Sequence, residues 1–374
     1  MNSSISTPPS VSWLPAHPVY GGVSMTRYWK LLEGAIRPDD PFVCCSMLRS
    51  GDAVPPFLGG RVQRFLTRRV VYPMIVKGRA KGDIVHILDH SWADLLPYAP
   101  GQALKVVTVH DLIPLRFPGE LSAAQAKRFR SWVSHLAEAD VIIADSAYTK
   151  REVEELSGID GAKIQVVLLG VELPGARPPV AGQTFLPPRA DHGKHFRVGS
   201  IGSTLERKNL GILPAALARL QQMTRRKVVL VRVGALLPVP LAAALRQELG
   251  DDGLIELGQL PDAAIGEYYA GLDVVVMPSL YEGFGLPVLE GMAARVPVVA
   301  SRSSSLPEVG GDLAYYFDPY APEELAVVLG RIATDGVAPR QLDEGYVRAQ
   351  DMSWRKCLEG IYQVYQEALD RGQR

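Results

Sequence analysis

The segment from Val274 to Ser301 constrains the fold more than any other part of the chain. It begins with a β-branched run typical of a buried parallel strand, and a second such run, Val296 to Ala300, closes it. Between the runs lie a tight loop and a helix that begins near Pro287. Proline suits the first helical turn, because the N–H that it lacks would have no hydrogen-bond partner within the helix. This strand–loop–helix–strand order predicts a parallel α/β sheet. Ligands of such sheets bind at the carboxyl ends of the strands, where this loop lies.

The loop carries groups that can hold a polar ligand. Gly283 and Gly285 allow the backbone to approach a ligand closely, and the N–H groups at the helix N-terminus can bind anionic oxygens. Two carboxylates, Glu282 and Glu290, are separated by seven residues. Because carboxylates accept hydrogen bonds from hydroxyl groups, a polyhydroxylated ligand could span both. The alternative is a solvated loop glutamate followed by a glutamate that caps the helix.

This stretch resembles the E-x7-E signature of the retaining, family-4-like glycosyltransferases of the GT-B fold, which include bacterial mannosyl- and rhamnosyltransferases of surface polysaccharide synthesis. The resemblance implies two Rossmann-like domains facing a cleft, with a C-terminal helix that crosses back to the first domain. It implies that Glu290 holds the nucleotide ribose. It also implies that Glu282 acts at the catalytic centre, where the donor sugar is held with the help of the backbone of Gly283, Phe284, Gly285 and Leu286.

A basic pair, Arg207 and Lys208, follows the first strand expected in the second half of the chain. We expect the pair at the N-terminus of a helix from about Leu210 to Gln222, where the helix dipole makes each cation unfavourable by tenths of a kcal/mol. A bound diphosphate would reverse that sign, and surface solvation is the alternative. The resemblance implies that both residues are catalytic and grip the donor phosphates. It further implies that the backbone at Gly258 and Leu260 contacts the nucleobase.

The first half offers further candidates at the ends of predicted strands. Gly21 and Gly22 precede a helix expected from Val23 to Glu33, and such a loop either holds a phosphate or simply turns the chain. His110 and Asp111 follow a buried strand within the string VHDLIPL. A histidine there is either a satisfied polar group or a catalyst. The string resembles mannosyl- and rhamnosyl-type members of the family, which implies that His110 is catalytic and lies beside the donor sugar, with Asp111 in the substrate site.

The stretch from Arg61 to Lys81 is basic and interleaved with apolar residues. It contains no acidic residue before Asp83, and Pro73 is expected to interrupt any long helix through it. This pattern fits either an interfacial membrane element or a solvated helix face. Its basic residues are Arg61, Arg64, Arg68, Arg69, Lys77, Arg79 and Lys81.

Length and composition support two α/β domains. The chain has 374 residues, of which 47% are hydrophobic, enough for two full cores. We place an acceptor-binding domain at 1–185, joined by the helix 355–374, and a nucleotide-sugar-binding domain at 195–354. The boundary lies in the proline- and glycine-rich linker 174–194.

Charge and targeting signals narrow the partners and the location. Lys and Arg together number 40, as do Asp and Glu, so no charge imbalance indicates nucleic acid. The three cysteines form no disulfide framework and suit a reducing compartment. The N-terminal stretch lacks a signal-peptide pattern, and no apolar run approaches the roughly 20 residues that span a bilayer. We therefore expect a cytoplasmic protein, with the basic stretch as a candidate for peripheral contact with the inner face of the cytoplasmic membrane.

The predicted reaction is hexosyl transfer with retention. The chain has no D-x-D triplet and no His/Cys cluster, so we expect no catalytic metal and no cofactor beyond the nucleotide-sugar co-substrate. The VHDLIPL resemblance favours GDP-mannose or a GDP-deoxyhexose as donor and a lipid-linked oligosaccharide or polysaccharide as acceptor. The alternatives are a UDP-sugar-dependent transferase, a nucleotide-sugar epimerase, a sugar phosphorylase and a non-catalytic nucleotide-sugar-binding module.

Overall fold

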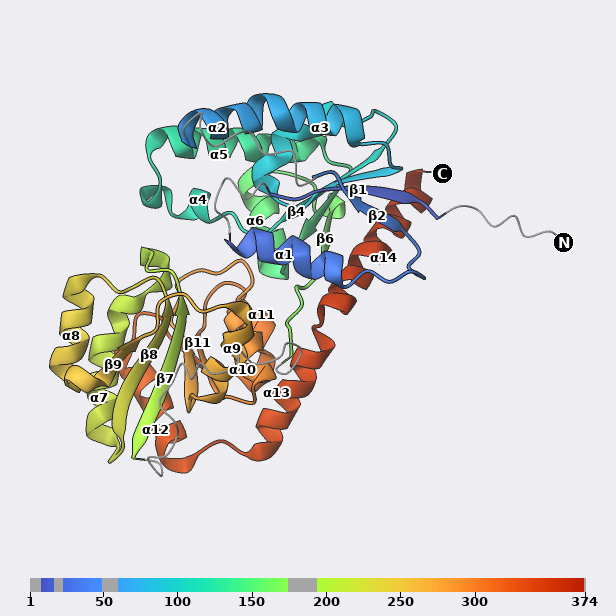
Figure 1. The fold of residues 1–374 in the computed structure, drawn as a ribbon. Helices are drawn as coiled ribbons and strands as arrows, with labels where there is room; N and C mark the ends of the chain where they lie inside the picture. Colours follow the sequence, from blue (N-terminus) through green and yellow to red (C-terminus); the bar gives the residue numbers. More distant parts are fainter. Residues whose placement is uncertain (1–7, 17–22, 49–59, 174–193, 373–374) are drawn as a thin grey trace. The chain divides into compact units, whose positions relative to one another are not determined.

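The computed structural model describes residues 8–16, 23–48, 60–173 and 194–372 (Figure 1). The chain forms two compact units: unit 1 contains Met1–Leu168 and Trp354–Arg374, and unit 2 contains Leu169–Ser353. The division lies earlier than the boundary expected within 174–194, because Val171 already pairs with Ser353 in a β-bridge of unit 2. Most of the proline- and glycine-rich stretch lies outside the described residues.

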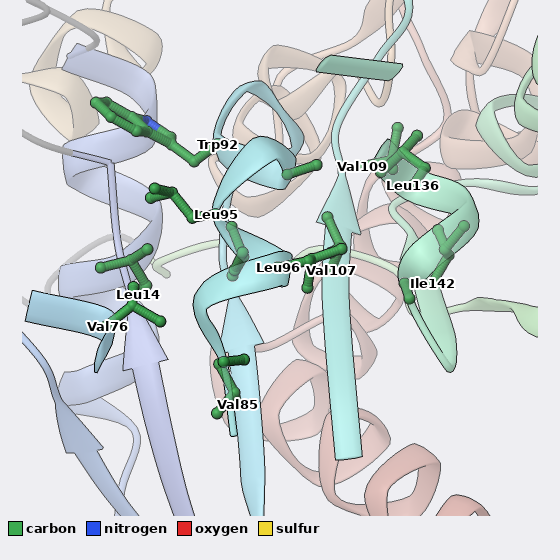
Figure 2. Close-up of a cluster of buried hydrophobic side chains, with 14 of the residues drawn as sticks. Leu14, Val76, Val85, Trp92, Leu95, Leu96, Val107, Val109, Leu136 and Ile142 are labelled. Carbon is green, nitrogen blue, oxygen red and sulfur yellow. The ribbon is translucent and has the colours of Figure 1, made fainter. Parts of the chain in front are cut away.

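Unit 1 is built on a parallel six-stranded sheet with the strand order β2-β1-β3-β4-β5-β6. Its central strands are buried and mostly apolar, as expected when helices cover both faces of a parallel sheet. Figure 2 shows part of the core, in which Val85, Val107 and Ile142 of three neighbouring strands cluster with Leu95 and Leu96. The strands are β1 (Ser10–Leu14), β2 (Val43–Ser46), β3 (Ile84–Ile87), β4 (Leu104–Val109), β5 (Val141–Ala144) and β6 (Ile164–Val166).

Helical segments connect these strands, as parallel pairing requires. The carboxyl ends of β3, β4 and β5 therefore meet at one edge of the sheet, just before His90, His110 and Asp145. The helical segments of unit 1 are α1 (Val23–Gly34), α2 (Gly60–Leu66), η3 (Thr67–Val71), α3 (Tyr72–Arg79), η4 (His90–Tyr98), α4 (Ile113–Arg116), η5 (Pro118–Glu120), α5 (Ala123–Ser134), η6 (His135–Glu138), α6 (Ala147–Ser157), η7 (Gly161–Lys163) and α14 (Trp354–Gly372).

The basic stretch is helical from Gly60 to Arg79, so the expected interruption at Pro73 is wrong. The turn before the proline, η3, is a π-helix in which the Tyr72 N–H donates to the Thr67 carbonyl, five residues back. This wider turn accommodates the proline at the start of α3, where its missing N–H is tolerated. The three segments therefore follow one another without a loop.

The C-terminal helix α14 belongs to unit 1, which confirms the predicted crossing back to the first domain. Its Tyr365 hydroxyl accepts a hydrogen bond from Trp13 Nε1 at 3.0 Å and lies 2.5 Å from His86 Nδ1. At its N-terminal end, Arg355 forms a 2.6 Å ion pair with Asp40. Buried hydrogen bonds and an ion pair thus attach the last helix to β1, β3 and the segment before β2.

Unit 2 contains a second parallel six-stranded sheet, with the order β12-β11-β10-β7-β8-β9. Successive residues of its strands face opposite sides, so Val228 and Leu230 enter one apolar cluster while Val229 and Val231 enter another. The strands are β7 (His195–Gly202), β8 (Lys227–Gly234), β9 (Leu254–Glu256), β10 (Val274–Met277), β11 (Val298–Ser301) and β12 (Tyr315–Phe317).

The helices of unit 2 cover both faces of this sheet (Figure 1). The predicted strand–loop–helix–strand unit is present as β10, a loop, α10 and β11, with β10 and β11 paired in parallel. The helical segments are η8 (Glu206–Lys208), η9 (Leu210–Ile212), α7 (Leu213–Met223), α8 (Val239–Leu249), η10 (Asp251–Gly253), α9 (Asp262–Ala270), α10 (Leu286–Ala293), α11 (Leu306–Gly310), η11 (Gly311–Leu313), α12 (Pro322–Asp335) and α13 (Pro339–Asp351).

Candidate active site

Glu282 and Lys208 meet at the carboxyl edge of the unit 2 sheet. The Glu282 carboxylate accepts hydrogen bonds from Lys208 Nζ and from the Ser279 hydroxyl, each at 2.6 Å. Glu282 is 8% exposed, so the pair is largely withdrawn from water. Both charged groups are partly buried at the ends of the strands. An anionic, hydroxylated ligand can replace the contact between Lys208 and Glu282 with contacts to itself.

A run of serines after β11 holds the loop that carries Glu282. The Glu282 N–H donates to Ser304 Oγ at 2.9 Å, and Ser305 Oγ donates to the carbonyls of Glu282 and Phe284 at 2.9 and 2.7 Å. The Ser303 hydroxyl donates to the Leu280 carbonyl. Sequence reasoning missed these serines, although a serine run that directly follows a buried strand signals such a position.

Gly285 fixes the start of α10. Its φ of 104° lies in the region that favours glycine, and a Cβ there would lie 2.6 Å from Leu306 Cδ2. The helix then begins at Leu286, with Pro287 in its first turn as predicted. Gly283 and Phe284 precede it in the same loop, so the residues expected to hold the donor sugar by their backbone lie together, and their role stays a prediction.

Glu290 lies on α10 and is 8% exposed. Its Oε2 accepts a hydrogen bond from the Tyr269 hydroxyl of α9 at 2.8 Å. Tyr269 is almost wholly buried, so this contact sets the direction of the carboxylate. A carboxylate can accept several hydrogen bonds at once, and the predicted contact of Glu290 with the ribose hydroxyls stays a prediction.

The basic pair lies on the short turn η8, not at the N-terminus of a long helix, so that expectation is wrong. Asn209 ends the turn in a left-handed conformation with a φ of 52°, and α7 begins only at Leu213. The Asn209 amide donates to the carbonyls of Pro278 and Pro319 at 3.1 and 2.7 Å. The Leu280 N–H donates to the Arg207 carbonyl at 2.7 Å. Asn209 and these backbone contacts, which the sequence did not reveal, hold η8 against the Glu282 loop.

Three glycines lie at the carboxyl ends of neighbouring strands, beside Lys208. Gly202, Gly234 and Gly258 end or follow β7, β8 and β9, and all have positive φ values. The Gly234 N–H donates to the Gly258 carbonyl at 2.7 Å, and a Cβ on Gly234 would lie 2.3 Å from the Gly202 carbonyl oxygen. Gly258 and the half-buried Leu260 therefore lie just after β9, at the carboxyl edge of the sheet. Their predicted contact with the nucleobase requires this position, and the contact itself stays a prediction.

Sequence reasoning missed Arg232, a buried cation that contacts the backbone at the first of these glycines. Its side chain rises from β8, is 1% exposed, and donates through Nη2 to the carbonyls of Gly202 and Ser203 at 2.6 and 2.8 Å. Nη1 contacts Ser200 Oγ at 3.3 Å. Burial lowers the pKa of the guanidinium, and no carboxylate of the described residues contacts it within hydrogen-bond distance. An arginine inside an apolar strand was the available signal.

In unit 1, His110 forms a buried pair with Asp145. His110 Nδ1 lies 2.6 Å from Asp145 Oδ2, and Nε2 donates to the Leu88 carbonyl at 2.8 Å. Burial acts to lower the pKa of His110, but the charge and hydrogen bond of Asp145 outweigh it and raise this pKa to about 9. Both ring nitrogens face acceptors, so the imidazolium form fits. The predicted catalytic role of His110 stays a prediction.

The remaining predicted residues of unit 1 have mixed outcomes. Asp111 Oδ1 accepts a hydrogen bond from the Ile113 N–H at 3.0 Å, which supports the start of α4. Gly21 and Gly22 lie outside the described residues, so their predicted phosphate contact stays a prediction. Asp145, which Sequence analysis did not single out, is the partner of His110, and Ser146 caps α6.

The basic helical stretch presents fewer cations to solvent than its sequence indicates. Arg68 is largely buried and pairs with Asp94 at 2.6 Å, and Arg79 donates to the Met47 carbonyl at 2.9 Å. Arg64, Arg69, Lys77 and Lys81 are exposed. Apolar side chains are exposed on the same stretch, with Phe65 at 62% and Met74 at 67%. The described helices include none long and apolar enough to cross a membrane.

Two family models match the chain. The model of group 1 glycosyl transferases matches residues 195–335, and that of Glycosyltransferase Family 4 matches residues 33–173. The chain is 30% identical over 312 residues to the MMP alpha-(1->4)-mannosyltransferase of Mycolicibacterium hassiacum, covering 78% of this chain and 72% of that protein. It is also 37% identical over 110 residues to the O-antigen chain mannosyltransferase B of Escherichia coli, covering 29% of each.

Solved glycosyltransferase structures have the same fold. Sucrose-phosphate synthase from Thermosynechococcus elongatus superposes with a TM-score of 0.70 at 20% identity, over 97% of this chain and 100% of that one. Anabaena Alr3699/HepE, solved with UDP and glucose, gives a TM-score of 0.71 at 17% identity, over 96% of this chain and 100% of that one. The E-x7-E loop, the two Rossmann-like sheets and the relatives agree. The chain belongs to the family 4 glycosyltransferases and has the GT-B fold.

Proposed function

We propose that this glycosyltransferase is a retaining hexosyltransferase that moves mannose or a deoxyhexose from a GDP-linked donor to a lipid-linked saccharide. The observation that carries the proposal is the Lys208–Glu282 pair at the strand edge, together with Glu290 on the helix α10 that follows the same loop. The paired groups suit the phosphate and sugar parts of one ligand, and Glu290 suits its ribose. The similarity to two mannosyltransferases supports mannose as the sugar.

In this proposal, each polar group has one part of the donor to bind. Arg207 and Lys208 bind the diphosphate, Glu290 the ribose, and Glu282 the hydroxyl groups of the sugar. As the phosphate binds, Lys208 Nζ either leaves the Glu282 carboxylate or contacts both the carboxylate and the phosphate. The interaction strengthens as the sugar–phosphate bond breaks, because negative charge then grows on the diphosphate.

The proposed reaction is a front-face transfer that retains the anomeric configuration. The bond between the anomeric carbon and the β-phosphate oxygen breaks, and the acceptor hydroxyl bonds to that carbon on the same face. The acceptor proton passes to the β-phosphate oxygen. The described residues contain no group of three or more His, Cys, Asp or Glu side chains arranged to hold a metal. We propose that cationic side chains neutralise the diphosphate, and full activity in EDTA is the expected result.

A panel of GDP- and UDP-sugars tests the donor. A ligand present at 100 times its Kd stabilises the fold by about 2.7 kcal/mol, so thermal shifts rank the candidates. The expected ranking places GDP-mannose or a GDP-deoxyhexose first, with transfer to an acceptor in a radiolabel assay. A UDP-sugar as the most stabilising ligand contradicts the proposal of a GDP-linked donor. Turnover of donor without acceptor indicates an epimerase, and phosphate-dependent cleavage indicates a phosphorylase.

The lipid-linked acceptor and peripheral membrane contact are proposed from the surface of α2, η3 and α3. Exposed Phe65 and Met74 accompany exposed Arg64, Arg69 and Lys77, which is the composition of an interfacial helix at an anionic bilayer. Each such cation contributes about 1 kcal/mol near the surface. We propose that the protein works at the cytoplasmic face of the membrane.

Co-sedimentation with anionic vesicles tests this contact. The variant Arg64→Glu/Arg69→Glu/Lys77→Glu should lose binding, and salt should weaken binding by wild type. Arg68 is left intact because it supports the fold. Equal pelleting of wild type and variant, or equal pelleting on neutral vesicles, leaves this helix as a solvated face and makes a lipid-linked acceptor unnecessary.

A further inference from the structure

A cavity of about 270 Å³ lies in unit 1, where η3, the end of η4 and α5 meet. Figure 1 shows the chain of α2 and α3 running beside α5 on one side of this unit. Arg68 and Arg69 line the cavity from η3, and Arg128, Trp132 and His135 line it from α5 and the turn that follows. The cavity belongs to the helix layer of unit 1, and His110 is not among its lining residues.

Arg68 forms a rigid wall of this cavity. Its guanidinium carbon lies 4.6 Å from the Trp92 ring centroid and 4.1 Å from that of Trp132. Nη2 donates to Asp94 Oδ1 and to the Ser91 carbonyl, each at 2.6 Å. Stacking and hydrogen bonds therefore hold this arginine in place. Asp94 is the only carboxylate among the lining residues, and Arg68 already uses it.

The other two arginines give the cavity an excess of positive charge. Arg69 and Arg128 are exposed, and within the described ranges no ion pair joins either of them to a carboxylate. The helix α5 carries Lys127, Arg128 and Arg130 and no acidic residue, and the stretch Gly60–Arg79 carries none either. The only neighbouring acid on the following turn, Glu138, pairs with His135 at 2.7 Å.

We propose that this cavity binds a phosphomonoester group. Guanidinium groups present paired N–H donors that match the oxygens of a phosphate, and two exposed arginines beside a fixed third can contact it from different sides. The volume lies just below the roughly 300–1,000 Å³ of pockets for drug-sized ligands, which suits a phosphorylated headgroup. The phosphate belongs either to a small soluble ester or to a lipid whose chains meet exposed Phe65 and Met74.

The proposal is independent of glycosyl transfer, and only its lipid arm rests on the proposed membrane contact. Glycerol 3-phosphate is the soluble probe, titrated by calorimetry at low salt. Lys208→Ala serves as the background protein, because it weakens binding of the probe at the donor site. In this background, Arg128→Gln should weaken binding of the probe by about 10-fold, which corresponds to about 1.4 kcal/mol.

Arg130→Gln is the matched control. Arg130 lies on the same helix, is exposed and does not line the cavity, so the substitution removes the same charge from the same region. It should leave binding of glycerol 3-phosphate almost unchanged, and Arg69→Gln should behave like Arg128→Gln. Equal losses in Arg128→Gln and Arg130→Gln, or no binding in the Lys208→Ala background, overturn the proposal.

Vesicles distinguish the two sources of the phosphate. The arms contain phosphatidic acid, which exposes a phosphomonoester, or phosphatidylglycerol, which exposes a diester, at matched surface potential. Tighter binding to phosphatidic acid that is lost in Arg128→Gln and kept in Arg130→Gln supports a lipid headgroup. Equal binding to both vesicles, together with arginine-dependent binding of glycerol 3-phosphate, supports a soluble ester.

Discussion

Single side chains at the carboxyl edge of the unit 2 sheet carry the proposed chemistry, and each is held by a contact that the linear sequence does not display. Lys208 meets Glu282, Tyr269 orients Glu290, and Arg232 supports the Gly202 loop from below. Arg232 is buried, but Lys208, Glu282 and Glu290 lie at the polar carboxyl edge of the sheet rather than inside an apolar core. Substitutions there should therefore alter turnover more than folding.

Lys208→Ala and Glu290→Ala should each lower kcat by about 100-fold, since loss of one preorganised charged contact in the transition state typically has this effect. The thermal midpoint should change by only a few degrees. Lys227→Ala is the matched control, because Lys227 pairs with Asp252 at the other end of β8. Near-normal turnover in both site variants contradicts the assignment of the donor site.

Arg232→Met should lower turnover without unfolding the protein. Burial of a guanidinium without a carboxylate partner is costly, so an apolar side chain of similar size offsets part of the loss of its hydrogen bonds. The Gly202 and Ser203 carbonyls lose their donor, so the loop beside Lys208 should bind the diphosphate less well and KM for the donor should rise about 10-fold. A large fall in thermal stability with unchanged KM shows instead that Arg232 only supports the fold.

The His110–Asp145 pair should make stability depend on pH. The pKa of His110 is raised to about 9 in the folded state, against about 6.5 in the unfolded chain. Its contribution, up to about 3 kcal/mol, is therefore complete below pH 6.5 and is lost as the pH rises through 9. Chemical denaturation between pH 6.5 and 9.5 measures the slope. His110→Asn/Asp145→Asn, which keeps polar contacts without charge, should flatten it, and an unchanged slope contradicts this origin.

At the scale of elements, a chain of buried hydrogen bonds fastens α14 to the unit 1 sheet. Trp13 Nε1 donates to the Tyr365 hydroxyl, which donates to His86 Nδ1, while His86 Nε2 lies 2.8 Å from Thr108 Oγ1. Burial lowers the pKa of His86 to about 3, so its ring stays neutral and can accept from the tyrosine. The network explains how the last helix returns to the first sheet.

Tyr365→Phe should destabilise unit 1 by roughly 2–4 kcal/mol, because it leaves the buried Trp13 and His86 nitrogens without their partner. Tyr320→Phe is the control, since Tyr320 is exposed at 78%. Urea denaturation followed by tryptophan fluorescence measures the change. Equal midpoints for Tyr365→Phe and wild type mean that apolar packing alone holds α14.

At the scale of the molecule, each unit has its own sheet and its own apolar clusters. All five tryptophans lie in unit 1, so their fluorescence reports the unfolding of that unit alone. GDP at 100 times its Kd should stabilise unit 2 by about 2.7 kcal/mol. The transition seen by circular dichroism should then shift while the fluorescence transition stays in place. A joint shift of both signals contradicts independent unfolding of the units.

The sequence alone determined the features that follow from local chemistry. Strands were predictable from short β-branched runs, and the α10 N-terminus from glycines followed by Pro287, because burial of parallel strands and the fixed φ of proline act over a few residues. The spacing of Glu282 and Glu290 is also a local feature of the sequence, and it indicated the family. Pro73 and the basic pair were misjudged, because a π turn and the left-handed Asn209 changed the local geometry.

Only the tertiary structure decided which distant groups meet. The partners of Glu282, Glu290 and His110 lie 74, 21 and 35 residues away in the sequence, on other strands or helices. Parallel strands place their carboxyl ends side by side whatever their order along the chain, so these contacts depend on the sheet order and not on spacing. The same applies to Arg68, which looks like a surface cation in the sequence but is buried between Trp92 and Trp132, 24 and 64 residues later.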